Sequence, residues 1–290
     1  MGCPGRIISD CQSPLIAMRR IQFIELHEQP WFPPTLRHEI TDALQCGSQH
    51  LKAYDPISDL LQRALDASGS RSVVDLCSGS GGPWLDLSRK LRVNTTPYRI
   101  WLTDKFPNCA AFENLKAASA NSVDFYRISV DAMKVPADLA GFRTMFSSFH
   151  HFPPSHARAF LQNAVNARQG IGIFEITSRT LSAIGIMFLW SLTPFAFAPS
   201  MRPFRWSRLI YTYLLPLIPM VLLFDGIVSC LRTYRTWELR GLIDELETTE
   251  YIWEIGEQSG AFGGLPITYL IGYPREDSIS TTAMRIRDVI

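Results

Sequence analysis

Segment 73–82 joins a strand-like apolar run to a glycine-rich turn, and its residue types favour ligand binding. It reads Val-Val-Asp-Leu-Cys-Ser-Gly-Ser-Gly-Gly. Gly79 and Gly81 can adopt positive φ and allow a ligand to approach the backbone closely. A helix that begins near Gly82 would direct its free N–H groups into the same space. These features predict a binding loop between a strand and a helix.

Three aspartates are expected near this loop. Asp75 ends the apolar run, Asp104 ends the next predicted strand in Trp-Leu-Thr-Asp, and Asp131 follows the third strand. Ligands of open α/β sheets bind beyond the carboxyl ends of the strands, where all three would lie. Asp104 also has the separation from the loop that is usual for an acid that binds a ribose. The structural alternative for Asp104 is a helix N-cap.

The loop does not fit the common phosphate-binding patterns. The dinucleotide pattern G-x-G-x-x-G fails because Trp84 occupies the position of the third glycine, and no G-K-[ST] sequence follows the loop. The acid immediately before the loop disfavours a pyrophosphate and favours a cationic ligand. S-adenosylmethionine has a sulfonium, an ammonium group and a ribose diol but no phosphate, so it suits such a loop.

The run Val-Val-Asp-Leu-Cys-Ser-Gly-Ser-Gly-Gly resembles motif I of class I S-adenosylmethionine-dependent methyltransferases. Asp104 matches the ribose-binding acid of that family, and Asp131-Ala132 matches its adenine-contacting pair. Segment 146–152, Phe-Ser-Ser-Phe-His-His-Phe, resembles the strand-four segment of several small-molecule methyltransferases. The resemblance covers about 70–178 and 236–272 and includes a reversed seventh strand. It departs at Cys77, where the family usually has glycine.

The resemblance implies a role in binding S-adenosylmethionine for each matching position. Asp75 would organise the loop, and the two loop glycines would face the methionine part of the cofactor. Asp104 would hold the ribose hydroxyls through charge-assisted hydrogen bonds. The implied cofactor-binding residues are Asp75, Cys77, Ser78, Gly79, Gly81, Asp104, Asp131 and Ala132.

Three residues are candidates for a catalytic base, which methyl transfer needs only when the acceptor carries a proton. His150 and His151 follow the fourth predicted strand, and either could take that proton because histidine titrates near neutrality. Alternatively, one stacks under the cofactor and the other caps the following helix. Glu175 ends the fifth predicted strand, and its structural alternative is a salt bridge to Arg179.

The elements that must position these residues alternate between strand and helix. Strands are predicted at 72–76, 98–103, 123–128, 142–147 and 170–176, and helices at 82–91, 107–118, 155–168 and 236–246. An antiparallel strand pair, 251–257 and 266–272, is predicted around Gly263-Gly264. This alternation predicts right-handed crossovers and a parallel sheet covered on both faces. The expected fold class is α/β, Rossmann-like, with a seven-stranded mostly parallel sheet, helices on both faces and an apolar helical insertion.

The N-terminal part, 1–69, is expected to form a helical arm and lid before the α/β core at 70–178. Asp55 can cap a helix with Pro56 at its first position and with one apolar face: Ile57, Leu60, Leu61, Ala64 and Leu65. Before it, Gln-Pro-Trp-Phe-Pro-Pro is a rigid turn that presents two aromatic rings. That turn is either a hydrophobic clamp for the arm or a lid, and Trp31 is a candidate acceptor contact. The first residues form a loose arm and match neither a signal peptide nor a myristoylation site.

The part at 179–235 is an apolar-basic insertion. No Asp or Glu occurs from 176 to 224, and the charged residues there are Arg179, Arg202, Arg205 and Arg208. Stretch 180–201 is long enough to cross a bilayer, which takes about 20 residues, but it contains Gly185, Pro194 and Pro199. Three interpretations stay open: a membrane hairpin, a monotopic or interfacial contact that suits anionic lipids, and a soluble lid or dimer contact. Each predicts a lipophilic acceptor or one presented from a membrane.

The end of this insertion supplies further candidate contacts to the methyl acceptor. The C-terminal part, 236–290, is then expected to complete the α/β core. Asp225, Arg232 and Tyr234 could hydrogen-bond a polar group of the acceptor inside an apolar pocket. Asp225 and Arg232 could equally pair with each other.

Composition excludes several other classes of protein. Lys and Arg number 28 and Asp and Glu 27, so nothing indicates a nucleic-acid-binding surface. The six cysteines are scattered without a C-x-x-C pair, so neither a metal site nor a disulfide framework is expected. These observations favour a cytoplasmic protein, with a peripheral or monotopic membrane contact as an option, and leave the oligomeric state open.

The sequence therefore predicts an S-adenosylmethionine-dependent methyltransferase that acts on a lipophilic small molecule, at a membrane or facing one. One alternative is an enzyme of the same fold that binds the cofactor and catalyses another reaction. The other is a membrane-associated binding or scaffold protein, which the cysteine in the loop would favour.

Overall fold

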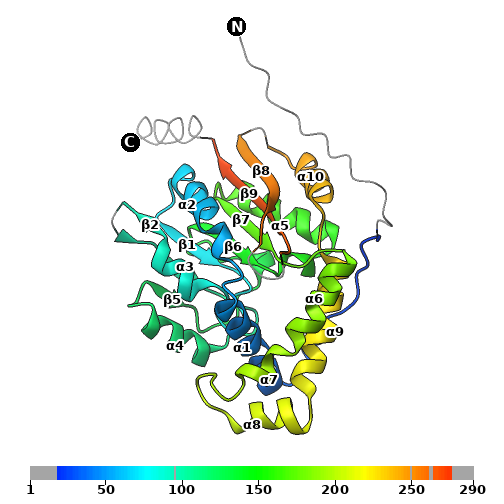
Figure 1. Cartoon of the computed structure of the whole chain (residues 1–290). Coiled ribbons are helices and arrows are strands. Elements are labelled where there is room, and N and C mark those ends of the chain that lie inside the picture. The colour runs from blue at the N-terminus through cyan, green and yellow to red at the C-terminus, as the bar shows by residue number, and fades with distance from the viewer. Residues whose placement is uncertain (1–17, 95, 249, 261–263, 276–290) are drawn as a thin grey trace.

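The computed structural model describes residues 18–94, 96–248, 250–260 and 264–275. Residues 1–17 of the expected arm and Gly263 of the expected turn lie outside the described residues. The core is one seven-stranded sheet between helices, with a helical extension at the end of the sheet where the parallel strands finish (Figure 1).

The sheet has the strand order β5-β4-β1-β6-β7-β9-β8. Strands β5, β4, β1, β6 and β7 are parallel, whereas β9 runs antiparallel between β7 and β8. The seven predicted strands and the reversed strand are thus confirmed. Their bounds are β1 Ser72–Asp75, β4 Arg99–Leu102, β5 Val123–Phe125, β6 Phe142–Phe146, β7 Ile171–Glu175, β8 Tyr251–Gln258 and β9 Ile267–Pro274.

Helices cover both faces of the sheet because successive strand residues point to opposite sides. Val73 packs in a cluster with α2 (Ser58–Ala67), α3 (Trp84–Lys90) and α4 (Cys109–Ala118). Its neighbour Val74 packs in a second cluster with α5 (Pro154–Asn166) and α10 (Thr236–Asp244). The predicted helices of the core are therefore confirmed.

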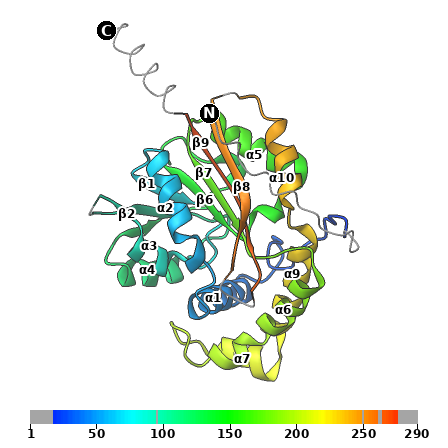
Figure 2. The ribbon, with the colours of Figure 1, turned by 45° about the horizontal axis from the view of Figure 1, so that its top comes forward.

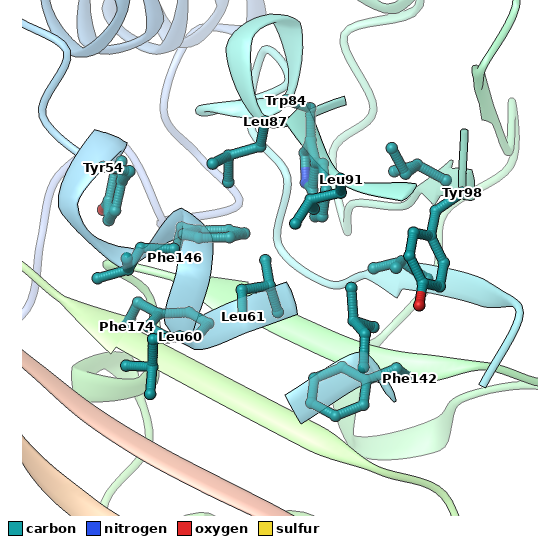
Figure 3. Packing of buried hydrophobic residues seen from close by; sticks show 14 of the residues in the cluster. Tyr54, Leu60, Leu61, Trp84, Leu87, Leu91, Tyr98, Phe142, Phe146 and Phe174 are labelled. Carbon is teal, nitrogen blue, oxygen red and sulfur yellow. The ribbon is translucent and has the colours of Figure 1, made fainter. Parts of the chain in front are cut away.

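Trp84, which breaks the dinucleotide pattern, is a buried anchor of the first cluster. Its indole meets the ring of Phe146 edge-on at 5.6 Å, and Phe146 stacks on Phe174 at 5.3 Å. Figure 3 shows these side chains packed between α2, α3 and the sheet. Trp84 thus holds α3 on the sheet, at the position where the dinucleotide pattern has its third glycine.

One long helix was not predicted. Helix α1 spans Pro34–His50 and packs Leu36 and Ile40 against Ile218 and Leu222 of the insertion. The apolar periodicity is weak because the polar residues Arg37, Glu39 and Asp42 are also buried.

The prediction that Asp55 caps the following helix is wrong. Residues Asp55–Ile57 form a 3₁₀ turn, η1, and neither η1 nor α2 has a side-chain cap. The Asp55 carboxylate instead pairs with Lys90 at 2.9 Å, on the neighbouring helix α3. A two-stranded hairpin, β2 (Arg92–Val93) and β3 (Thr96–Pro97), was also not predicted.

The insertion after β7 is helical, as expected. Helices α6 and α9 lie side by side and extend below the sheet together with α7 and α8 (Figure 2). Within the described residues no single helix is long and apolar enough to cross a membrane. Two consecutive helical pieces, Trp206–Leu214 (α8 with η4) and α9, have that length and apolarity only when taken together, and they are bent by 73° at the break between them. The bounds are α6 Leu181–Ser191, α7 Thr193–Phe197, α8 Trp206–Leu209, the π-helical turn η4 Ile210–Leu214 and α9 Leu217–Arg232.

Candidate functional site

Asp75 is buried at the end of β1 and is bound on both sides. Thr144 on β6 donates its hydroxyl to one carboxylate oxygen at 2.7 Å, and Ser78 donates to the other at 2.6 Å. Burial raises the pKa of Asp75 to about 7, although these hydrogen bonds act in the opposite direction. Asp75 therefore holds the start of the loop against the neighbouring strand.

The loop after β1 turns through a series of left-handed residues. The φ angles are +58° at Cys77, +58° at Gly79, +109° at Gly81 and +47° at Gly82. The conformation at Cys77 explains why a glycine would suit this position, since φ near +60° is strained for most other residues. At Gly81 a Cβ atom would lie 2.7 Å from Leu115, so a side chain would clash as well as strain the backbone.

Asp104 connects this loop to the turn after β4. Its carboxylate accepts the backbone N–H of Gly79 at 2.8 Å and that of Phe106 at 2.7 Å. The N-cap alternative for Asp104 is wrong, because Asn108 caps helix α4 by accepting the N–H of Ala111. Burial raises the pKa of Asp104, and the two backbone hydrogen bonds oppose that rise.

Asp131 and Ala132 lie in the turn after β5, close to the same edge of the sheet. Asp131 is exposed and accepts the N–H of Met133 at 2.9 Å, at the start of the 3₁₀ turn η2 (Ala132–Lys134). The N–H of Val130 donates to the carbonyl of Asp104 at 2.9 Å, which links this turn to the previous one. The positions expected to bind the cofactor are thus brought to one edge.

His150 and Glu175 form a buried pair at the ends of β6 and β7. His150 lies in the 3₁₀ turn η3 (Phe149–His151), and its Nδ1 lies 2.7 Å from Glu175 Oε2. Glu175 also accepts the N–H of Phe149 at 2.7 Å. The salt bridge expected between Glu175 and Arg179 is absent, because Arg179 pairs with Glu238. Burial opposes a charge on His150, but Glu175 and Glu25 outweigh it and raise the pKa of the imidazole.

Segment 18–33, which has no regular helix or strand and turns at 26–32, lies across this edge, and we call it the strap. Ile21 donates its N–H to the carbonyl of Leu231 at 3.1 Å, and Arg20 donates to the carbonyl of His150 at 3.1 Å. Figure 1 shows the start of the strap beside α9. Two shallow surface hollows lie elsewhere, one beside Ser48 and Pro83 and one beside Glu113.

The strap carries two acidic residues that the sequence analysis did not single out, Glu25 and Glu28. His151 lies between them, with its Nε2 3.3 Å from Glu25 Oε2 and its Nδ1 2.8 Å from Glu28 Oε1. Burial opposes a charge on His151, but these two carboxylates raise its pKa to about 10. Their separation from the histidines along the chain left no local pattern from which this contact could be predicted.

The expected acceptor contacts Asp225, Arg232 and Tyr234 hold the strap and η3. Asp225 accepts the backbone N–H of Leu26 at 2.7 Å and lies 2.7 Å from Nδ1 of His27. Arg232 binds Glu28 at 2.8 Å and the carbonyl of His151 at 2.7 Å, so the pairing expected between Asp225 and Arg232 is wrong. The Tyr234 hydroxyl donates to the carbonyl of Phe152 at 2.7 Å.

The two aromatic residues of the Pro-Trp-Phe-Pro turn are separated. Phe32 is buried between α1 and α9, in agreement with the clamp interpretation. The side chain of Trp31 is 65% exposed and lies outside the cluster around His150. Its predicted role as an acceptor contact stays a prediction.

A buried polar network joins the insertion to the loop. Arg208 on α8 binds Glu39 at 2.7 Å and Asp42 at 2.8 Å, and Arg205 also lies 3.3 Å from Asp42. Asp42 accepts the Ser80 hydroxyl of the loop at 2.7 Å. Two of the four arginines between 176 and 224, which would be free to contact anionic lipids under the interfacial interpretation, are therefore paired with carboxylates of α1.

No protein-family model and no curated protein matches the chain. A solved S-adenosylmethionine-dependent methyltransferase from Aquifex aeolicus is 14% identical, with a TM-score of 0.47 over 83% of this chain and 98% of that chain. Magnesium protoporphyrin IX methyltransferase ChlM from Synechocystis PCC 6803, solved with bound SAM, is 12% identical, with a TM-score of 0.42 over 79% of this chain and 80% of that one.

The mitomycin 7-O-methyltransferase MmcR is 14% identical, with a TM-score of 0.43 over 82% of this chain and 54% of that chain. The chain thus spans about half the length of MmcR. At such distant similarity, the sheet itself identifies the fold. Its order β5-β4-β1-β6-β7-β9-β8 with β9 reversed is the class I methyltransferase fold that the sequence resemblance implies.

Proposed function

We propose that this chain is an S-adenosylmethionine-dependent methyltransferase that acts on a lipophilic small molecule. The observation that carries the proposal is the hydrogen bond from Gly79 N–H to the Asp104 carboxylate, which joins the left-handed loop to the end of the adjacent strand. This is the part of an open α/β sheet where nucleosides bind.

The chemistry of the residues at this edge fits the cofactor. Asp104 uses one lone pair of each carboxylate oxygen for backbone N–H groups, and a carboxylate has further lone pairs that can accept ribose hydroxyls. Asp75 and Asp104 both flank the loop and would repel phosphates. The loop residues 77–82 would hold the methionine part, and Asp131 with Ala132 would contact the adenine.

When bound, S-adenosylmethionine supplies an activated methyl group whose transfer to the acceptor leaves S-adenosylhomocysteine. The protein aligns the acceptor and excludes water, and the strap over the sheet edge suits the second task. For an acceptor that carries a proton, the candidate bases His150, His151 and Glu175 lie together here. His151 is the most accessible of the three, since 19% of its side chain is exposed, but with a pKa of about 10 it would already carry a proton near neutral pH and would act as a base only at higher pH.

The surface of the insertion supports a lipophilic acceptor and a membrane contact. The side chains of Leu181 and Leu214 are 80% and 74% exposed, and that of Trp206 is 72% exposed. Arg202 of the same insertion is also exposed, and no acidic residue occurs between 176 and 224. Exposed apolar side chains with an exposed cation and no acids complement an anionic lipid surface.

A methyl-labelled cofactor tests the proposal. The purified chain is incubated with S-adenosylmethionine and a lipid extract, and both S-adenosylhomocysteine and label in the organic phase are measured. We expect both to accumulate with the wild type and to fall with Asp104→Asn. Cofactor binding without S-adenosylhomocysteine would favour a non-methylating enzyme of this fold, and calorimetry without cofactor binding would refute the proposal.

A further inference from the structure

Three side chains beside the sheet edge bring their ligand atoms together. Glu25 of the strap and His150 and His151 of η3 each offer one atom, and these atoms lie within 4.8 Å of one another. His150 Nε2 lies 3.2 Å from Glu25 Oε1, and His151 Nε2 lies 3.3 Å from Glu25 Oε2. The two histidines thus approach different oxygens of the same carboxylate, and a metal ion shared by the three side chains would bind between the two imidazoles and that carboxylate.

One of these atoms is buried without a well-aligned hydrogen bond. Among the described residues, Nε2 of His150 lies at ion-pair distance from Glu25 Oε1, 3.2 Å, but meets no hydrogen-bond geometry. A buried polar atom without a partner is costly and rare. A metal ion between His150 and Glu25 would satisfy it.

The other nitrogen of each imidazole is already held by a carboxylate. Nδ1 of His150 lies 2.7 Å from Glu175 Oε2, and Nδ1 of His151 lies 2.8 Å from Glu28 Oε1. Histidines that bind metals usually donate their second N–H to a carboxylate or carbonyl, which turns the free nitrogen toward the ion. Both histidines have this arrangement, with Nε2 directed to Glu25.

The charges around the site favour a divalent cation. Four carboxylates gather here, from Glu25, Glu28, Glu175 and Asp225, and the guanidinium groups beside them belong to Arg20 and Arg232. His27 lies 2.7 Å from Asp225 and 3.9 Å from Glu25, and Arg179 is paired with Glu238. Four carboxylates against two guanidinium groups leave an excess of two negative charges, which either a proton on each of the two imidazoles or one divalent cation in place of those protons would neutralise.

We propose that Glu25, His150 and His151 form a binding site for one divalent transition-metal ion. Two imidazoles and a carboxylate suit zinc, iron or manganese, and three protein ligands leave a position open for an exogenous ligand. This inference replaces the expectation that the chain has no metal site, which rested on local spacing alone. Because Glu25 belongs to the strap, the metal also fixes the strap to η3.

The open position gives the metal a role in the proposed function, and this step depends on that function. An acceptor hydroxyl bound to the ion would lose its proton to solvent more readily. The resulting oxyanion would form a bond to the methyl carbon of S-adenosylmethionine while the bond from that carbon to sulfur breaks, which leaves S-adenosylhomocysteine. The expected acceptor class is therefore a lipophilic molecule with a hydroxyl group.

Metal binding is tested on the full chain. The protein is freed of metal with a chelator and titrated with Co²⁺, Zn²⁺ and Mn²⁺, while absorbance, bound metal and heat are measured. We expect one ion per chain and visible Co²⁺ absorption bands. A folded wild type that binds none of the three ions would overturn the proposal, whether or not it binds S-adenosylmethionine.

Variants assign the ligands. His151→Ala and Glu25→Gln should weaken binding more than 100-fold, and Glu28→Gln, which keeps all three ligands, about 10- to 100-fold. His156→Ala, an exposed histidine on α5, is the matched control and should bind like the wild type. Circular dichroism identifies variants that do not fold. Equal metal affinity of folded His151→Ala and the wild type would exclude this site.

Discussion

Replacement of Asp104 by asparagine tests the proposed cofactor site most directly. The carboxylate already accepts two backbone N–H groups, at 2.8 Å from Gly79 and 2.7 Å from Phe106. Asparagine removes the charge and offers one oxygen, so its amide nitrogen must face one of these N–H groups. The ribose diol would lose charge-assisted hydrogen bonds as a consequence.

The size of the loss follows from the kind of bond. A hydrogen bond to a charged group contributes about 1.5–3 kcal/mol. The asparagine side chain keeps one oxygen that can still accept a hydrogen bond, so the variant loses only part of the binding energy of the two ribose hydroxyls. We therefore expect a loss of about 2–3 kcal/mol, which corresponds to about 30- to 150-fold weaker binding. Burial raises the pKa of Asp104, so the wild-type affinity should fall as the pH is lowered, whereas the affinity of the variant should vary less.

Calorimetric titration with S-adenosylmethionine and S-adenosylhomocysteine at several pH values measures both the weaker binding and its pH dependence. The stoichiometry of binding reports the folded fraction of each protein. Asp124→Asn is the matched control, because Asp124 lies within β5 and pairs with Lys116 at 2.9 Å. That control should bind like the wild type. If folded Asp104→Asn binds within twofold of the wild type, Asp104 does not hold the cofactor.

The other predictions concern stability and lipid binding. The pKa of Asp75 is raised from 3.8 to about 7 in the folded chain, so stability should fall by up to about 4 kcal/mol between pH 4 and 7. Asp75→Asn should remove that slope in urea unfolding; an unchanged slope would contradict the assignment. Arg208→Ala leaves two buried carboxylates without their main partner and should cost about 3–5 kcal/mol in urea unfolding, whereas Arg202→Ala, at an exposed position, should cost less than about 0.5 kcal/mol. Trp206→Ala combined with Leu214→Ala should lower co-sedimentation with anionic vesicles several-fold without altering S-adenosylmethionine affinity, and equal sedimentation would argue against a lipid-facing insertion.

The core was predictable because its signals are local. Apolar runs such as 72–76 end at glycines or acids, and each forms a strand whose partners the crossover rule restricts. Helix α1 was missed for an equally physical reason. Its buried face includes Glu39 and Asp42, whose burial depends on Arg208 far along the chain, and a local hydrophobic pattern contains no information about such pairs.

The same reason explains the errors at the site. Asp225 and Arg232 are close on one helix, and a mutual pair was the structural alternative to their predicted role as acceptor contacts. The strap supplies closer partners, His27 for Asp225 and Glu28 for Arg232. Residues on one helix can thus face different neighbours when a third segment packs against them.

The strap and α1 connect the insertion to both sides of the proposed active site, the loop after β1 and the turn η3. On one side, Ser80 of the loop, Asp42 of α1 and Arg208 of α8 form a continuous buried network. On the other, the strap joins η3 to α9 through Glu28 and Arg232. Buried polar networks are costly when one member loses its partner, so the insertion cannot move far from the sheet unless these contacts break. The insertion is therefore tied to the α/β core by these contacts, and under the proposed function a lipophilic acceptor that enters along it would reach the same edge of the sheet as the cofactor.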